Sequence, residues 1–347
     1  MARHRAHCLS SEHSVPPPVP LSAEHCSTTL PQVICTDGAK SGTFAVLLSA
    51  ALFGTTGTVL VAAPLGAEAW SAGAWRLLVG ALTLVALAVL ADRRTRRRGI
   101  TVPPHRWPAV GTTAVGAVGV AVFQVGYFLA VERTGVAVGT VATIGSGPAI
   151  AGAAGAVAAR HRPDRDWLAG TAVAVTGVVL LGIWGTSGNE ASADAVGILL
   201  ALAAAAGWAT FTTMSRRQID SGTPSTTSMA AVFAGGAVLV APALAWHGGG
   251  WALQGWGPLV VAHLGVLTVG VAYWSYGIAL RSLPAPTVIT LTLLEPITAA
   301  ALGIAVVGER LSPAGVAGIA LVLAGLAVTG RAAVRGAQHD APGTVPT

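Results

Sequence analysis

Long apolar runs separated by short polar gaps dominate the chain from residue 42 to residue 330. Each run holds about twenty residues, enough to cross the hydrocarbon core of a bilayer as a helix. We therefore predict an all-α polytopic membrane protein with ten transmembrane helices. The expected spans are Gly42–Ala63, Trp70–Ala91, Trp107–Val131, Gly135–Ala159, Trp167–Gly185, Ala195–Met214, Thr226–Trp246, Gly257–Leu280, Pro284–Gly308 and Leu311–Gly330.

The two halves of this pattern resemble each other. A shift of 148 residues superimposes five prolines and glycines: Pro148 on Pro296, Gly155 on Gly303, Gly170 on Gly318, Gly177 on Gly325 and Gly182 on Gly330. Five spans per half is an odd number, so the second copy must insert upside down, and such inverted repeats place a substrate site near the midplane. We expect two inverted five-helix repeats, at 42–185 and 195–330. Residues 1–41 are expected to form a disordered cytoplasmic tail, and residues 331–347 a second cytoplasmic tail.

Charged residues are scarce and unevenly placed. They make up 10% of the chain, against about 25% in a soluble domain. Cytoplasmic lysines and arginines orient membrane helices, and with the N-terminus inside, 17 of the 20 basic residues fall on the inner side. Only Arg133 and Arg310 fall outside, and Arg76 lies within a span. This asymmetry predicts a multi-pass protein of the plasma membrane with both termini cytoplasmic, and it indicates no nucleic-acid partner.

One carboxyl stands inside the ninth span. Glu295 is the only charged residue between Pro284 and Gly308, and it falls near the middle of that run. Ionisable groups at membrane depth are costly and usually functional. Pro296 follows directly and removes a backbone donor, which loosens the helix beside the carboxyl. We interpret Glu295 as a substrate or proton site; the alternative is a structural role in which its carboxyl satisfies the carbonyl freed by Pro296.

Two further ionisable groups lie nearer the outer membrane surface. Arg76 is about 9 Å from the outer end of the second span, and we expect its side chain to extend to that surface. The alternative is that Arg76 holds an anionic substrate group or pairs with Glu295. His263 lies at a similar depth in the eighth span, where a packed, hydrogen-bonded histidine is expected over a titrating relay.

Polar aromatic side chains supply the remaining candidates for a binding pocket. Gln124 and Tyr127 lie three residues apart and share a helix face, as do Tyr273 and Tyr276. Trp208 and Trp274 lie well inside the membrane, and with these tyrosines they would line an aromatic pocket. Helix packing with internally satisfied polar tips is the equally weighted alternative.

The cysteines and the four histidines among them (His4, His7, His13 and His25) point to no metal site. Cys8, Cys26 and Cys35 all precede the first span, and their spacing to nearby histidines matches no standard zinc pattern. We expect neither a metal nor a cofactor.

Several motifs together resemble the drug/metabolite transporter superfamily in its EamA branch. They are Leu294-Glu295-Pro296, Gly308-Glu309-Arg310-Leu311, Gly318 with Gly325, Trp208 in Ala-Gly-Trp-Ala and Arg76 in Ala-Trp-Arg-Leu-Leu. The resemblance implies a ten-helix inverted-repeat carrier that moves small organic solutes, often outward. Gly147, not a carboxylate, precedes Pro148, so any proton site is confined to one half.

The function expected from these features is secondary active transport of a small organic solute (a metabolite, amino acid or drug-like compound). Export coupled to protons or to solute exchange is expected. A phosphate-binding loop is absent, so ATP is not the direct driver. An intramembrane enzyme and a channel are the alternatives, but the spans lack paired catalytic groups and filter sequences. The expected partners are the small-molecule substrate and the lipid bilayer, and a homodimer is left open.

Overall fold

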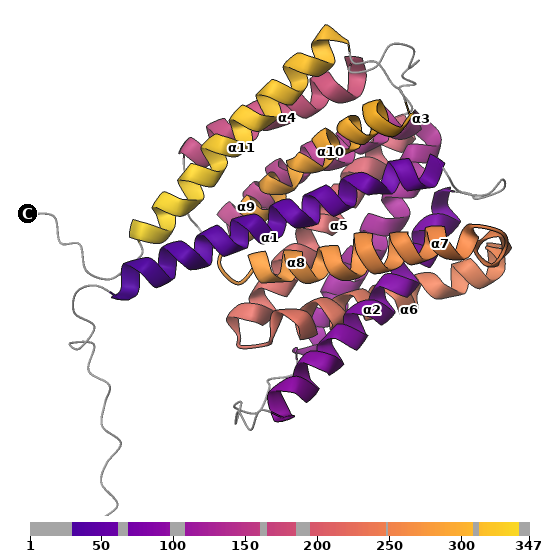
Figure 1. The fold of residues 1–347 in the computed structure, drawn as a ribbon, viewed down its shortest axis with the longest axis horizontal. Helices are drawn as coiled ribbons and strands as arrows, with labels where there is room; N and C mark the ends of the chain where they lie inside the picture. The colour runs from indigo at the N-terminus through magenta and orange to yellow at the C-terminus, as the bar shows by residue number, and fades with distance from the viewer. Residues whose placement is uncertain are drawn as a thin grey trace, which may run out of the picture.

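The chain folds into a bundle of long helices that lie side by side (Figure 1). The structure is a computed structural model that describes residues 30–61, 69–97, 108–159, 165–184, 195–247, 249–307 and 312–339. Within these ranges the regular elements are helical and no strand occurs. The elements are α1 (Leu30–Val61), α2 (Ala69–Arg97), α3 (Val110–Ala159), α4 (Arg165–Trp184), α5 (Ala195–Asp220), α6 (Ser225–His247), η2 (Gly250–Leu253), α7 (Gly257–Ala262), η3 (His263–Val271), α8 (Ala272–Ala279), α9 (Ala285–Leu291), η4 (Thr292–Leu294), α10 (Glu295–Leu302), η5 (Gly303–Val307) and α11 (Pro313–His339).

Among the described residues, seven helical stretches are long and apolar enough to cross a membrane. A shorter apolar stretch covers Pro313–Thr329. The prediction of an all-helical polytopic membrane protein is therefore confirmed. The seven stretches are Lys40–Leu60, Trp70–Arg97, Val110–Thr134, Ala195–Asp220, Ser225–Pro242, Gly257–Ala279 and Ala285–Val306.

Helix α3 reverses direction within its helical run. The Tyr127 hydroxyl and Thr140 Oγ1 lie 3.0 Å apart in a hydrogen bond, although thirteen residues of straight helix would separate them by about 20 Å. A Cβ added to Gly139 would lie 3.0 Å from Val131 Cα. The segments before and after residues 132–138 therefore lie against each other, where the sequence predicts a tight turn between two spans.

Helix α1 starts earlier than the sequence analysis predicts. We expected a disordered tail up to residue 41, but α1 begins at Leu30. Pro31 lies in the first turn of α1, where a missing N–H breaks no hydrogen bond, and no proline follows before Pro64. The helix thus continues without interruption into the apolar stretch from Lys40. The part of the expected tail before Leu30 lies outside the described residues.

Glycines bring α4 and α11 into close antiparallel contact. A Cβ added to Gly177 would lie 2.6 Å from the Gly318 carbonyl oxygen, and one added to Gly170 would lie 2.9 Å from that of Gly325. Pairing therefore runs in opposite directions along the two helices. Figure 1 shows α11 lying along α4 at one side of the bundle. Small residues allow this approach of two backbones, which stabilises helix pairs in lipid by packing.

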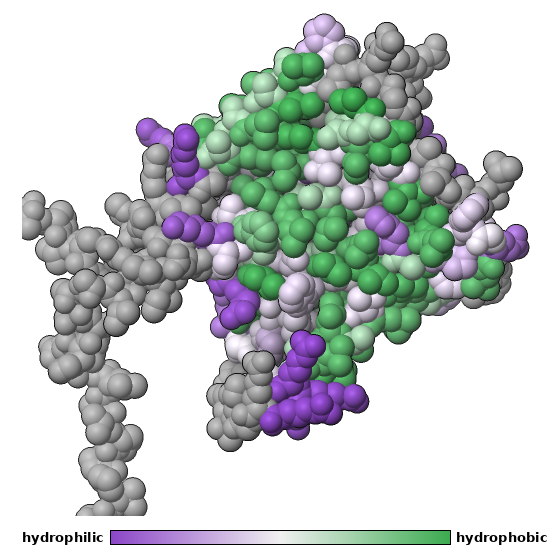
Figure 2. Space-filling view, viewed as in Figure 1, coloured by the Kyte–Doolittle hydropathy of each residue, from purple (hydrophilic) through white to green (hydrophobic). Residues whose placement is uncertain are grey.

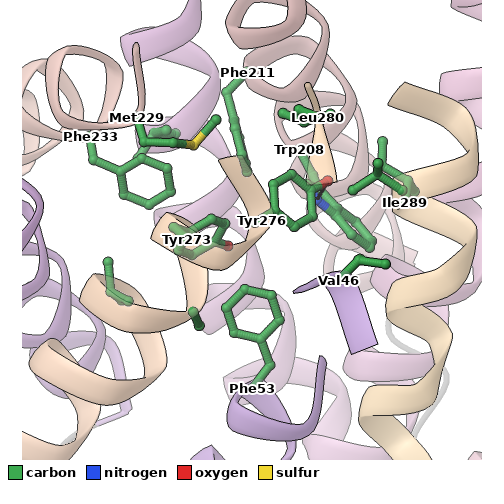
Figure 3. Close-up of a cluster of buried hydrophobic side chains, with 14 of the residues drawn as sticks. Val46, Phe53, Trp208, Phe211, Met229, Phe233, Tyr273, Tyr276, Leu280 and Ile289 are labelled. Carbon is green, nitrogen blue, oxygen red and sulfur yellow. Dashed lines mark hydrogen bonds between the residues drawn. The ribbon is translucent and has the colours of Figure 1, made fainter. Parts of the chain in front are cut away.

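The largest cluster of buried side chains lies where α1, α5, α6 and α8 meet. It includes Phe53, Phe211, Met229 and Phe233 (Figure 3). The outer surface is also apolar: the face in Figure 2 is largely hydrophobic, with hydrophilic patches mainly towards its borders. An apolar exterior around a packed interior is what a bilayer requires of a helical bundle.

Candidate functional site

The helix that carries Glu295 is broken directly before that residue. Helix α9 ends at Leu291, the tighter turn η4 covers Thr292–Leu294, and α10 begins at Glu295. In a regular α-helix the Thr292 carbonyl would accept from residue 296, but Pro296 has no N–H. The Glu295 backbone N–H donates to the Thr292 carbonyl instead, which produces the tighter turn. The loosening expected at Pro296 is therefore present.

This backbone arrangement leaves the Glu295 carboxyl without a structural task. The carbonyl that Pro296 frees already has a donor. The carboxyl forms no hydrogen bond or ion pair with any residue in the described part of the chain. It is half-buried. Helix α1 approaches it closely at Gly54, where an added Cβ would lie 2.8 Å from the Glu295 carbonyl oxygen.

Arg76 lies inside the bundle. The residue is 6% exposed, and its Nε atom is buried without a hydrogen-bond partner. The expectation that Arg76 extends to the outer surface is therefore wrong. Its guanidinium lies within electrostatic reach of Glu295. The packing of α2 decides this: Gln124 donates from Nε2 to the Gly73 carbonyl at 2.9 Å, which holds the turn before Arg76 against α3.

Tyr273 lies among aromatic rings close to both charges. Its ring centroid is 4.2 Å from that of Phe233 and 4.8 Å from that of Phe53. Arg76 and Glu295 both lie within electrostatic reach of its hydroxyl. The Tyr273 hydroxyl makes no hydrogen bond within the part of the chain that the structure describes. Figure 3 shows this hydroxyl directed toward the space between the rings of Phe53 and Tyr276.

Tyr276 and Trp208 are joined by a hydrogen bond across the bundle. Trp208 Nε1 donates to the Tyr276 hydroxyl at 3.2 Å. Thr212 Oγ1, one turn after Trp208, lies 3.0 Å from the same hydroxyl. Tyr276 is fully buried, and its ring centroid is 5.7 Å from that of Tyr273. The hydroxyl therefore has an internal role, in contrast to that of Tyr273.

Tyr127 belongs to the same region through its contacts. Its hydroxyl is bonded to Thr140, and Arg76 and Glu295 lie within electrostatic reach. Phe123 connects it to Trp208, because the Phe123 centroid is 6.2 Å from each of these two rings.

Two of the aromatic and polar candidates lie elsewhere. His263 Nε2 is 2.9 Å from Thr55 Oγ1, and since the Thr55 hydroxyl donates to the Leu52 carbonyl, the histidine is the donor to Thr55. His263 begins the wide helical segment η3, more than two turns before Tyr273. Trp274 is 37% exposed. Its expected place in the aromatic pocket is therefore wrong, because Tyr273 and Tyr276 take the buried face of α8.

Of the ten residues that the sequence analysis considers for the site, the structure thus gathers eight, all except His263 and Trp274, and it adds residues that the sequence analysis missed. Thr212 follows Trp208 at helical spacing, a signal that was present in the sequence. Phe53, Phe211 and Phe233 carried no such signal, because an apolar ring in an apolar span is typical of simple packing. The resulting arrangement has one carboxyl, one guanidinium and one hydroxyl that make no hydrogen bond to the described residues, beside aromatic rings. Such groups can bind a polar or charged solute and exchange a proton at the carboxyl.

Comparisons with known proteins agree with these features. The model of the EamA-like transporter family matches twice, at residues 40–183 and 195–331. An "Uncharacterized transporter YwfM" from Bacillus subtilis (strain 168) is 38% identical over 283 residues, covering 82% of this chain and 91% of that protein.

A solved structure titled "Crystal structure of protein" has a similar fold. It superimposes with a TM-score of 0.67 at 20% identity, over 85% of this chain and 98% of the other. On the family matches and the relative, the chain belongs to the EamA-like transporter family.

Proposed function

We propose that this transporter exports a small organic solute and couples its movement to protons or to solute exchange through Glu295. One observation carries the proposal: a half-buried carboxyl on a broken helix has no hydrogen-bonding partner in the described protein and lies within electrostatic reach of Arg76, whose buried Nε atom has none either. Placing an ionisable group at membrane depth costs free energy, so such groups usually serve a function. Substrate and coupling sites of secondary transporters are formed by discontinuous helices of this kind.

The proposed architecture is ten membrane crossings in two inverted repeats. The contacts between α4 and α11 support it, since under the 148-residue shift Gly170 corresponds to Gly318 and Gly177 to Gly325. Gly177 meets Gly318 and Gly170 meets Gly325, so exchanging the two halves maps each contact onto the other. Two halves related by a two-fold axis make such reciprocal contacts. If that axis lies in the membrane plane, the two paired helices run antiparallel, as α4 and α11 do.

The proposed location is the plasma membrane, with both termini in the cytoplasm. The placement of lysines and arginines supports this orientation. Single cysteines test it in a variant that lacks Cys8, Cys26 and Cys35. A cysteine at exposed Gln254 should react with an impermeant thiol reagent in sealed cells, and one at exposed Ser221 should not. Reversed labelling would contradict the orientation.

A growth panel of metabolites and toxic compounds tests the function. Cells that overproduce the protein should tolerate, or release, a specific set of solutes better than cells without it. The Glu295→Gln protein at equal membrane abundance should give the cells no added tolerance or release. The control Glu132→Gln, which removes an exposed carboxyl at the turn of α3, should behave as wild type. Equal protection by the Glu295→Gln protein would contradict the role of this carboxyl. Saturable tracer exchange of the identified solute separates a carrier from a channel.

A further inference from the structure

A groove opens between α1, the α9–η4 segment and α11, away from the candidate substrate site. Its volume is about 780 Å³, within the range of ligand pockets. The walls are apolar and come from all three elements: Phe44 and Leu47, Leu291 and Leu294, and Leu323 and Leu326. Phe44 is 70% exposed and Leu323 is 50% exposed, so the groove is open on the side where lipid would surround the bundle.

Two cations, Lys40 and Arg331, lie at one end of this groove, and none of the described residues that line it is acidic. Lys40 is the first residue of the apolar stretch in α1, and Arg331 follows the apolar stretch of α11 by two residues. Both side chains are therefore expected at the level where the hydrocarbon core ends. Figure 1 shows the start of α1 beside the end of α11.

We propose that this groove binds an anionic phospholipid. The headgroup phosphate lies between Lys40 and Arg331, and an acyl chain lies along the leucines of α1, α9 and α11. Basic pockets between transmembrane helices recognise anionic headgroups in this way. The combination of cations at one end and a hollow apolar wall fits such a lipid, whereas a soluble anion would leave the apolar part of the groove unfilled.

The acyl chain would contact the turn that precedes the candidate site. Leu291 ends α9 and Leu294 ends η4, directly before Glu295. A lipid in the groove therefore packs against the loosened part of this helix and supports it from the side opposite the interior. Lipid binding depends only on the groove, so this proposal does not require that Glu295 acts in transport.

Lipid retention measures the binding. The purified full chain is taken from nanodiscs of equal parts phosphatidylglycerol and phosphatidylcholine with identical acyl chains, and the retained lipids are counted by native mass spectrometry. Wild type should retain phosphatidylglycerol preferentially. The double variant Lys40→Gln/Arg331→Gln should lose about fivefold of this preference for each basic residue removed. The matched control Arg94→Gln/Arg217→Gln removes two exposed basic residues outside the groove and should keep the wild-type preference.

A second variant tests the apolar part of the groove without changing charge. Ala327 lines the groove and is exposed, so Ala327→Trp should fill it and abolish tightly retained phosphatidylglycerol. Glycerol phosphate, which has the headgroup without the acyl chains, should not compete. Unchanged lipid preference in the Lys40→Gln/Arg331→Gln protein, or an equal loss in the control, would overturn the proposal. Competition by glycerol phosphate, or unchanged retention of phosphatidylglycerol by the Ala327→Trp protein, would overturn it as well.

Discussion

The two proline-bearing helices that the 148-residue shift superimposes have different backbones. Around Pro148, α3 continues as a helix to Ala159. Around Pro296, the chain passes from α9 through the tight turn η4 into α10, and then into the wide segment η5. Hydroxyls bond back to carbonyls four residues earlier beside both prolines, at Ser146 in the first helix and at Thr290 and Thr292 in the second, so this source of bending is common to the two helices. Both helices contain a proline at this position, but only the helix with Pro296 is broken there.

The space beside each proline is also filled in opposite ways. Gly147 precedes Pro148, and the ring of Trp208 from α5 packs against it; an added Cβ would lie 2.7 Å from that ring. Glu295 precedes Pro296, and α1 presents Gly54 to its backbone. The residue before Pro148 is thus covered by the Trp208 ring from α5, whereas the residue before Pro296 is approached at its backbone by Gly54 of α1. The comparison teaches that packed side chains fill the space beside Pro148, while a carboxyl without a hydrogen-bonding partner among the described residues stands beside Pro296.

The largest effect is expected where α1 meets the broken helix. In Gly54→Val the Cβ would lie 2.6 Å from Thr298 Cβ and 2.8 Å from the Glu295 carbonyl oxygen, so a backbone must move. Overpacking of about 3 kcal/mol predicts about a 100-fold loss of transport of the solute identified by the panel. Gly57→Val, on the same helix, meets nothing within 4 Å and should retain full transport. Equal losses in the two variants would show that the contact has no special role.

A smaller effect is expected on the packed side. Gly147→Ala places a methyl group 2.7 Å from the Trp208 ring, and a side chain can shift more easily than a backbone. We expect about a tenfold loss of transport, from an overpacking cost near 1–2 kcal/mol. Adding Trp208→Phe should restore part of the loss by making room. If the double variant is worse than either single variant, the packing account of this half is wrong.

The internal hydrogen bond of Tyr276 should matter less. Tyr276→Phe removes the acceptor of Trp208 Nε1 and the partner of Thr212. Hydrogen bonds between membrane helices average about 0.6 kcal/mol, so the ratio of folded to unfolded protein in a denaturant titration should change about threefold. Thr213→Ala, which removes only a hydroxyl bonded to the Ala209 carbonyl of its own helix, should change stability less. A larger shift for Thr213→Ala would contradict the internal role of Tyr276.

The smallest effect on stability is expected for Tyr273→Phe. The Tyr273 hydroxyl has no hydrogen-bond partner in the described part of the chain, so its removal should leave the free energy of unfolding within about 0.5 kcal/mol of wild type. Because this hydroxyl is proposed to face the substrate, the apparent KM should rise while stability stays constant. A loss of stability with unchanged KM would mean that the Tyr273 hydroxyl serves helix packing and does not face the substrate.

Features that depend on local chemistry could be predicted from the sequence. A single carboxyl followed by proline in an apolar run predicts a loosened helix at Glu295, and the chain breaks there. Tyr273 and Tyr276 share a face because three residues make nearly one turn. The same rule applies to Trp274, which follows Tyr273 directly and so lies off that face; the sequence analysis did not use it there.

Features that depend on how helices rotate against one another could not be predicted. The depth of Arg76 follows from its position in the sequence, but its direction depends on how α2 packs against α3 at Gly73 and Gln124. The contact of Gly54 with the Glu295 backbone likewise requires the crossing of α1 with α10. In the sequence, nothing distinguishes Gly54 or Gly73 from the many other glycines of the chain.

Transport in proteoliposomes with an imposed proton gradient tests the central claim most directly. The solute found in the growth panel is loaded, and its movement is measured with and without the gradient for the wild-type and Glu295→Gln proteins. We predict that wild type concentrates the solute only when a gradient of protons, or of an exchanging solute, is present, and that Glu295→Gln shows no gradient-driven transport although it is folded and inserted equally well. Gradient-driven transport at the wild-type rate in the Glu295→Gln protein would contradict the account.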